Sequence, residues 1–228
     1  MHSKKFQEKK KTAKALGATT VELAIQTLKT MAKSKFDESI ELHARIGIDP
    51  KKSDQQIRQN VVLPHGTGKT NRVIAFVEPA LEATAKAAGA DIVGTEETID
   101  EIVKTGKIDF DVAIATPAMM PKLAKAARVL GPKGLMPNPK TDTVGPHVEK
   151  MIVDQKGGKI SFKNDSTCNI HMIIGKASFD EAKLIENAKV AVEALKKSKP
   201  SSSKGIFIKS LYLTSTMSPS IELDTSLL

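Results

Sequence analysis

The sequence predicts a two-domain protein of mixed class, in which an α/β domain is inserted into an α+β domain built from both ends of the chain. Three observations support this. Short apolar strands alternate with helices of about ten residues only in the middle of the chain. Strands and helices without that alternation occupy both ends of the chain. Two glycine-rich stretches separate these end segments from the middle segment. We expect one domain from 1–65 plus 156–228 and a second from 66–155.

The first end contains a helix and two strands. Thr19 and Glu22 have the spacing of a capping box, and apolar residues follow at helical intervals through Ala32. Residues 40–46 alternate apolar and polar, as in a half-buried strand, and a second strand covers 61–63. The basic N-terminus, MHSKKFQEKKKTAK, has no apolar segment after it and is interpreted as a solvated tail, the alternative being an arm that touches RNA.

The stretch LPHGTGKTNR resembles a nucleotide-binding P-loop, but its spacing is wrong. Five positions before Gly68 stands Leu63, where the loop requires a glycine, and Pro64 has no N–H to offer a phosphate. A strand-like run, VIAFV, follows where a P-loop enters a helix. The segment is therefore interpreted as a connector at a domain crossing. Gly66 and Gly68 here, with Gly157 and Gly158 at the second crossing, are the expected interdomain hinge.

The middle segment reads as strand–helix pairs: RVIAFV with PALEATAKAAG, DIVG with EETIDEIVKTG, and FDVAIA with PAMMPKLAKAARVLG. This pattern predicts a parallel sheet with helices on both faces. No glycine cradle for a dinucleotide follows VIAFV, so no cofactor is expected. Beyond it, KISFKN and CNIHMIIG predict strands, residues 180–197 a helix, and IFIKSLYLT and SIEL two more strands.

The distribution of charge along the chain indicates which kind of partner the protein binds. The net charge is +9. Residues 66–155 hold 11 Lys and Arg against 12 Asp and Glu, which leaves 24 against 14 in the rest of the chain. The basic excess lies wholly on the domain that contains both termini, as in a nucleic-acid face. The one cysteine, Cys168, and the scattered histidines predict neither a disulfide nor a metal site, and no membrane span or export signal is expected.

Five motifs occur in order along nearly the whole chain: GIDPKKSDQQIR, LPHGTGK, GPKGLMPNPKT, GKASF and STM-S-PS. Together they resemble the bacterial ribosomal protein L1 family. The resemblance implies that the inserted domain is Rossmann-like and that the protein is a non-enzymatic, cytoplasmic, ribosome-associated component of the large subunit, monomeric when free. It also implies binding to 23S rRNA as the mobile L1 stalk, assistance in releasing deacylated tRNA from the E site, contact with other large-subunit components, and repression of its own L11-type operon through the mRNA.

The same resemblance implies an RNA-binding face on the domain of both termini. Ser, Thr, Asn and Asp side chains can bond ribose 2′-hydroxyls, lysine supplies a phosphate contact, and Phe and Met can pack on sugar or base. The residues carried over are Lys35, Phe36, Asn164, Asp165, His171, Ser210, Thr216, Met217, Ser218 and Ser220. Taken singly, Asp165 is also a standard turn residue, Phe36 a possible core residue and Thr216 an ordinary strand residue.

Three glycines usual in the family are replaced by Gln59, Asp142 and Ser218. Asp enters the left-handed backbone region at modest cost, so Asp142 is expected to be absorbed, whereas Ser218 affects the fine geometry of the RNA face. Two other functions stay open: a stand-alone RNA-binding repressor, and an enzyme that uses the α/β domain. The second has thin support, because the middle segment offers no nucleophile–base pair and no carboxylate dyad.

Overall fold

The computed structural model describes residues 3–203 and 205–225. The chain forms two compact units, one of Met1–Gly68 with Ile160–Leu228 and the other of Lys69–Lys159. The predicted mixture of α+β and α/β architecture is confirmed, with the second unit inserted into the first. The crossings lie at 68/69 and 159/160, three and four residues beyond those expected. At the second crossing, the last helix of the second unit runs to Lys156, past the expected boundary.

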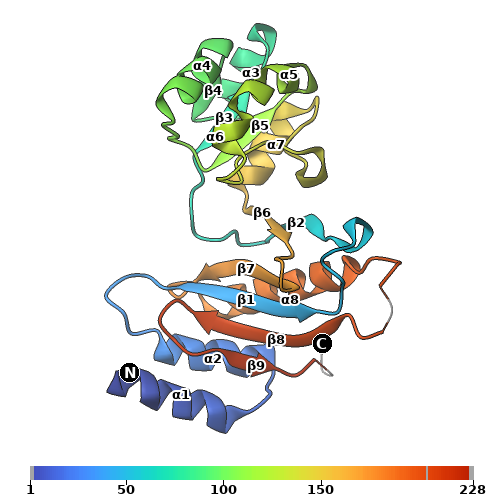
Figure 1. The fold of residues 1–228 in the computed structure, drawn as a ribbon. Helices are drawn as coiled ribbons and strands as arrows, with labels where there is room; N and C mark the ends of the chain where they lie inside the picture. The colour runs from blue at the N-terminus through green and yellow to red at the C-terminus, as the bar shows by residue number, and fades with distance from the viewer. Residues whose placement is uncertain (1–2, 204, 226–228) are drawn as a thin grey trace. The chain divides into compact units, whose positions relative to one another are not determined.

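The first unit is built on a four-stranded sheet of order β7-β1-β8-β9, with a separate β2-β6 pair (Figure 1). Its elements are α1 (Lys4–Leu16), α2 (Val21–Met31), β1 (Ser39–Ile46), the 3-10 turn η1 (Ser53–Gln55), β2 (Arg58–Val62), β6 (Lys159–Lys163), β7 (Asn169–Lys176), α8 (Glu181–Lys197), β8 (Ile208–Ser215) and β9 (Ile221–Leu223). The central strand β1 is antiparallel to both of its neighbours.

Alternation gives this sheet one buried and one open face. Leu42 pairs with Met172 on β7 and Leu213 on β8, and all three are buried in the main core. The helices α2 and α8 pack against each other and against the sheet, α2 on β8 and β9 and α8 on β7. The residues that alternate with the buried ones along these strands face away from the core and are mostly polar. The sequence pattern of residues 40–46 therefore predicted β1 and its inward face correctly.

Both N-terminal helices differ from expectation. Thr20, not Thr19, caps α2: its side chain accepts from the N–H of Leu23, while Thr19 bridges to Leu223 on β9. The N-terminus is not a solvated tail, because residues 4–16 form α1, capped by Ser3. With six lysines and only Ala13 buried, α1 lacks the apolar stripe by which helices are recognised in a sequence.

The second unit is a parallel sheet of order β4-β3-β5 with a core on each face. Its elements are β3 (Val73–Phe76), η2 (Pro79–Leu81), α3 (Glu82–Ala87), β4 (Ile92–Gly94), α4 (Glu96–Thr105), β5 (Val112–Ala115), η3 (Pro117–Met119), α5 (Met120–Leu123), η4 (Ala124–Ala126), α6 (Ala127–Leu130), η5 (Pro139–Thr141) and α7 (Val148–Lys156). The single helix expected over PAMMPKLAKAARVLG is instead four short helical turns, and α7 was not predicted.

The first crossing is held to the first unit as far as Gly68. The buried Asn187 of α8 accepts from the N–H of His65 (3.2 Å) and donates to the carbonyl of Gly66 (2.9 Å). A Cβ on Gly68, whose φ is +75°, would lie 2.9 Å from Lys176 Cγ. The chain then enters β3 rather than a helix, as expected for a connector and not for a P-loop.

At the second crossing only one of the two expected hinge glycines has an unusual backbone. Gly158 has a φ of +97°, a region that favours glycine. Gly157 instead ends α7 with a φ of −73°, which any residue can adopt.

Candidate nucleic-acid interface

The open face of the β7-β1-β8-β9 sheet carries the side chains that point away from the core. They are Glu41, His43 and Arg45 on β1, Asn169, His171 and Ile173 on β7, and Ser210, Tyr212 and Thr214 on β8. The unit that carries this face has 22 Lys and Arg against 14 Asp and Glu, a net charge of +8, while the second unit has 13 against 12, a net of +1. The redrawn crossings move Lys156 and Lys159 to the second unit, yet most of the basic excess stays with the first.

One end of this face is made by two loops that meet. Lys35 and Phe36 lie in the loop between α2 and β1, and Thr216 and Met217 lie in the turn between β8 and β9. Phe36 is 54% exposed and Met217 is 55% exposed. Large apolar side chains left this open by an ordered backbone are suited to contact with a ligand. The interpretation of Phe36 as a core residue is thus wrong.

The carboxylate of Glu38 joins the two loops. Glu38 is 1% exposed, and its Oε1 accepts from the hydroxyl (2.7 Å) and the N–H (3.3 Å) of Ser34. Its Oε2 accepts from the hydroxyl of Ser215 (2.7 Å) and the N–H of Met217 (3.1 Å). Burial acts to raise the pKa of Glu38, but these four bonds outweigh it and lower the pKa below its ordinary value. Sequence reasoning missed this residue.

Thr216 closes the same junction from the other side. Its hydroxyl oxygen accepts from the N–H of Ser39 at the start of β1 (3.0 Å), and its own N–H donates to the carbonyl of Ser39 (3.1 Å). Ser218 follows with its N–H bonded to the carbonyl of Ser215 (3.1 Å). Ser218 is not among the described residues with positive φ, so no left-handed backbone favours glycine there. It is 9% exposed, and its hydroxyl has no hydrogen-bond partner among the described residues.

Asp142 and Gln59 also stand where the family usually has glycine, and their backbones differ from each other. Asp142 adopts the left-handed region (φ 45°), as expected, and its carboxylate pairs with Lys159 at 3.2 Å. Gln59 lies exposed on the strand β2, where no positive φ occurs. Neither residue belongs to the β7-β1-β8-β9 sheet, because Asp142 is in the second unit and Gln59 lies on the β2-β6 pair.

At the opposite end of β1, Asn164 and Asp165 build the turn that leads from β6 into β7. Asn164 accepts from the N–H of Ile57 through its side-chain oxygen (2.8 Å). Asp165 accepts from the N–H of Asn169 (2.7 Å) and from both the N–H and the hydroxyl of Thr167. These bonds, that of Asn169 first, lower the pKa of Asp165 to about 2 despite partial burial. Asp165 is therefore a turn residue, as one alternative held, and an ionised one.

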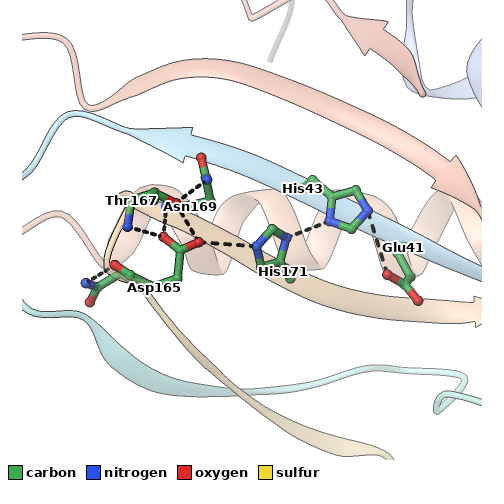
Figure 2. Close-up of polar contacts among 7 residues, drawn as sticks. Glu41, His43, Asp165, Thr167, Asn169 and His171 are labelled. Atoms are coloured by element: carbon green, nitrogen blue, oxygen red, sulfur yellow. Dashed lines mark hydrogen bonds and ion pairs between the residues drawn. The ribbon is translucent and has the colours of Figure 1, made fainter. Parts of the chain in front are cut away.

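Two histidines connect the middle of the face to this turn (Figure 2). His43 on β1 and His171 on β7 are directly opposite in the register, and their Nδ1 atoms lie 2.8 Å apart. His43 Nε2 lies 3.7 Å from a carboxylate oxygen of Glu41, and His171 Nε2 lies 3.7 Å from one of Asp165. The result is a row across two strands in the order carboxylate, imidazole, imidazole, carboxylate.

The protons of this row are constrained by its geometry. One Nδ1 must donate and the other accept, so the two rings share a single proton between them. Each Nε2 lies 3.7 Å from its carboxylate, which is ion-pair distance and longer than a hydrogen bond. Burial and the neighbouring His171 lower the pKa of His43, which Glu41 raises in part. His43 was missed because a lone histidine in an alternating strand carries no signal of its partner on β7.

The ten residues expected at the RNA face fall into two groups, one toward each end of β1. Lys35, Phe36, Thr216, Met217, Ser218 and Ser220 lie at or beyond the edge where β1 begins, and Asn164, Asp165, His171 and Ser210 lie toward the edge where β1 ends. Thr214 and Tyr212 on β8 bridge the two groups. Hydroxyls, amides, an imidazole and flanking lysines suit recognition of an anionic, hydroxyl-rich polymer better than they suit a reaction centre.

Among residues 3–203 and 205–225, no three His, Cys, Asp or Glu side chains gather in a way that could hold a metal ion. Within the same ranges, no helix combines the length and apolar character needed to cross a bilayer.

Comparison with known proteins gives one family. Residues 28–219 match the model of the ribosomal protein L1p/L10e family. A large ribosomal subunit protein uL1 from Streptomyces griseus is 52% identical over 203 residues, which cover 89% of this chain and 84% of that protein. One from Kosmotoga olearia is 49% identical over 222 residues, covering 97% and 96% of the two chains. A third, from Synechococcus, is 51% identical over 205 residues, covering 90% and 87%.

Proposed function

The chain belongs to the ribosomal protein L1p/L10e family, and from this premise we propose that it binds 23S rRNA directly through the open face of the β7-β1-β8-β9 sheet. The protein is a structural constituent of the large ribosomal subunit and not an enzyme. The resemblance expected from the five motifs is confirmed at the level of the family. Its place of action is the ribosome in the cytoplasm.

The observation that carries the proposal is the coincidence of charge and chemistry on one unit. The unit with a net charge of +8 also holds the open sheet, its hydroxyl and amide side chains, and the exposed Phe36 and Met217. Duplex RNA presents ribose hydroxyls and phosphates across a wide, shallow minor groove. A sheet face with Thr, Ser and Asn side chains suits contact with such a groove, and lysines suit contact with the phosphates.

Three finer roles complete the proposal. The protein forms the mobile L1 stalk, assists the release of deacylated tRNA from the E site, and represses its own L11-type operon by binding the mRNA. The mRNA role uses the same surface as the rRNA role, since a single face offers the contacts described above. A free repressor without a ribosomal role is the second candidate, and it differs in location rather than in chemistry.

The proposed contact surface is tested by separating discrimination from charge. Thr216→Val with Met217→Ala should reduce the preference for a 23S rRNA stalk fragment over random RNA of equal length by about tenfold, because hydrogen bonds that are removed leave partners unpaired at roughly 1–3 kcal/mol each. Glu193→Gln, on the exposed side of α8, is the control and should keep the preference. Unchanged discrimination in the double variant would move the interface elsewhere.

Sedimentation tests the ribosomal role independently. A tagged full-length chain should sediment with 50S particles and leave them only at high salt. Recovery of the chain solely in the free fraction, bound to its mRNA, would favour the free repressor.

We also propose that the two units change their relative orientation when RNA binds, with the hinge at the two crossings that Gly66, Gly68 and Gly158 flank. All three have positive φ and lie beside the crossings. Small-angle scattering with and without the rRNA fragment should give different profiles for the protein component. Identical profiles at full occupancy would contradict the hinge.

A further inference from the structure

A groove runs beside the candidate interface, between α1, the end of α2 and the β8–β9 turn. It has a volume of about 630 Å³, within the range of roughly 300–1,000 Å³ usual for small-ligand sites. Its lining includes Phe6, Met31 and Met217, the hydroxyls of Thr12, Thr30 and Ser34, and the side chains of Lys5, Lys9, Lys33 and Glu8. The groove therefore combines an apolar surface with three cations and one acid.

Met217 lines this groove and is also one of the residues expected to contact RNA. Its backbone is fixed on both sides, because its N–H donates to Glu38 (3.1 Å) and its carbonyl accepts from Lys9 Nζ (3.3 Å). The thioether side chain, by contrast, is 55% exposed. A polarizable side chain on a fixed backbone makes favourable contacts with an aromatic ring that approaches it. The groove is thus continuous with the surface proposed to bind RNA.

The chemistry of the groove selects one class of ligand. Three lysines match an anion, the hydroxyls match a sugar or phosphate oxygen, and Phe6 with Met217 matches a flat apolar ring. A nucleotide has all three parts. Bases that RNA-binding proteins read are mostly unpaired ones, turned out of the helix and stacked on apolar side chains.

We propose that this groove holds one unpaired nucleotide of the RNA bound on the sheet face, with its base against Phe6 and Met217 and its phosphate near Lys5, Lys9 and Lys33. The inference rests on the proposed RNA-binding function and adds a specific subsite to it. The sheet then reads the shape of the duplex, and the groove reads a single extruded base beside it.

The test fills the groove without touching the sheet face. Thr12→Phe does so from α1, where the Thr12 hydroxyl donates to the carbonyl of Glu8 in the same helix. Thr30→Phe does so from α2, where the hydroxyl likewise bonds the carbonyl of Thr27. Ala15→Phe adds the same ring to an exposed position of α1 that does not line the groove, and is the matched control.

The probes are the 23S rRNA stalk fragment and a set of transcripts that each lack one of its unpaired nucleotides. Both filling variants should bind the intact fragment about tenfold more weakly than wild type, and Ala15→Phe should bind it normally. One deletion transcript should lower wild-type affinity to the same extent and show no further loss with Thr12→Phe. Such non-additivity marks two changes that remove one interaction.

The outcomes separate the subsite from the function. If wild type prefers the fragment over random RNA and neither filling variant changes the affinity, the subsite is refuted and the function stands. If the filling variants weaken binding equally on the intact fragment and on every deletion transcript, the subsite is also refuted, since no single nucleotide would then occupy the groove. RNA binding unaffected by Thr12→Phe, with loss of a polyglutamate peptide that wild type binds, would assign the groove to an acidic protein instead. No preference of wild type for the fragment would refute the proposed function itself.

Discussion

Replacing Glu38 by Gln tests whether one buried carboxylate holds the two loops of the interface together. A glutamine of the same shape has one oxygen where Glu38 has two. Whichever position its NH₂ takes, one backbone N–H, that of Ser34 or that of Met217, loses its acceptor. The neighbouring serine hydroxyl can turn to accept instead. A buried donor without a partner costs roughly 1–3 kcal/mol, so the free energy of unfolding of the first unit should fall by about that amount.

The assay can report the first unit alone. The chain has one tyrosine and no tryptophan, and Tyr212 lies on β8 of that unit, so tyrosine fluorescence in a urea titration follows its unfolding. Glu41→Gln removes the same charge three residues further along the chain, on β1, but the partner of Glu41 is His43 at 3.7 Å. This control should change the unfolding free energy by less than about 0.5 kcal/mol.

The pH dependence of the unfolding free energy gives a second test of the role of Glu38. Because the pKa of Glu38 is lowered in the folded protein, its contribution is present above the pKa of the unfolded chain and is lost as the pH falls through the folded value. The gap between wild type and Glu38→Gln should therefore be full at pH 7 and narrow in acid. A Glu38→Gln variant as stable as wild type at pH 7, or a Glu41→Gln variant equally destabilised, would refute the role given to this carboxylate.

Three further predictions concern the same unit. Changing the exposed Lys10, Lys11 and Lys14 to Gln should make the plot of log affinity against log salt less steep. We expect a change in slope of about 0.7–0.9 for each phosphate that the protein no longer neutralises, with the preference for cognate over random RNA unchanged. An unchanged slope would show that α1 does not approach phosphates. Because the pKa of His43 is lowered in the folded protein, the unfolded chain binds the proton first, and stability should fall as the pH drops below about 6.5. His43→Gln should flatten this acidic part of a plot of urea midpoint against pH. An unchanged plot would show that the histidine pair does not cause the loss of stability. Ser218→Ala removes a buried hydroxyl that has no partner among the described residues and should stabilise the unit by up to about 1 kcal/mol; clear destabilisation by thermal unfolding would mean that a partner exists.

The sequence predicted the elements whose apolar spacing is regular. Alternation located β1, and the apolar stripe located α8, which begins at Glu181, one residue after the expected start, with Asp180 in the N-cap position. It missed α1, because a lysine-rich helix that buries only Ala13 has no periodic signal. It also ran one helix through Pro121, where the structure has only four-residue α5 and neighbouring 3-10 turns.

The site was harder to predict because its organisation is long-range. Glu38 reads as a turn residue in FDES, and its partners Ser215 and Met217 are 177 and 179 positions away. The pairing of His43 with His171 spans 128 positions. Short polar motifs indicate residue types that suit RNA, but only the strand register brings them together. The expectation that Ser218, in place of a family glycine, affects the fine geometry of the face was a local one, and Ser218 is not among the described residues with positive φ.

The register of β1 also bears on how the protein is made. Leu42 pairs with Met172 and Leu213, so the central strand of the first unit waits for 171 further residues before both neighbours exist. At about 5–20 residues per second, that interval is roughly 10–35 s of synthesis. The second unit is continuous in sequence and is free to fold meanwhile. A nascent or truncated chain that lacks β8 therefore has an unfinished candidate interface, and we expect RNA binding only after β8 has been synthesised.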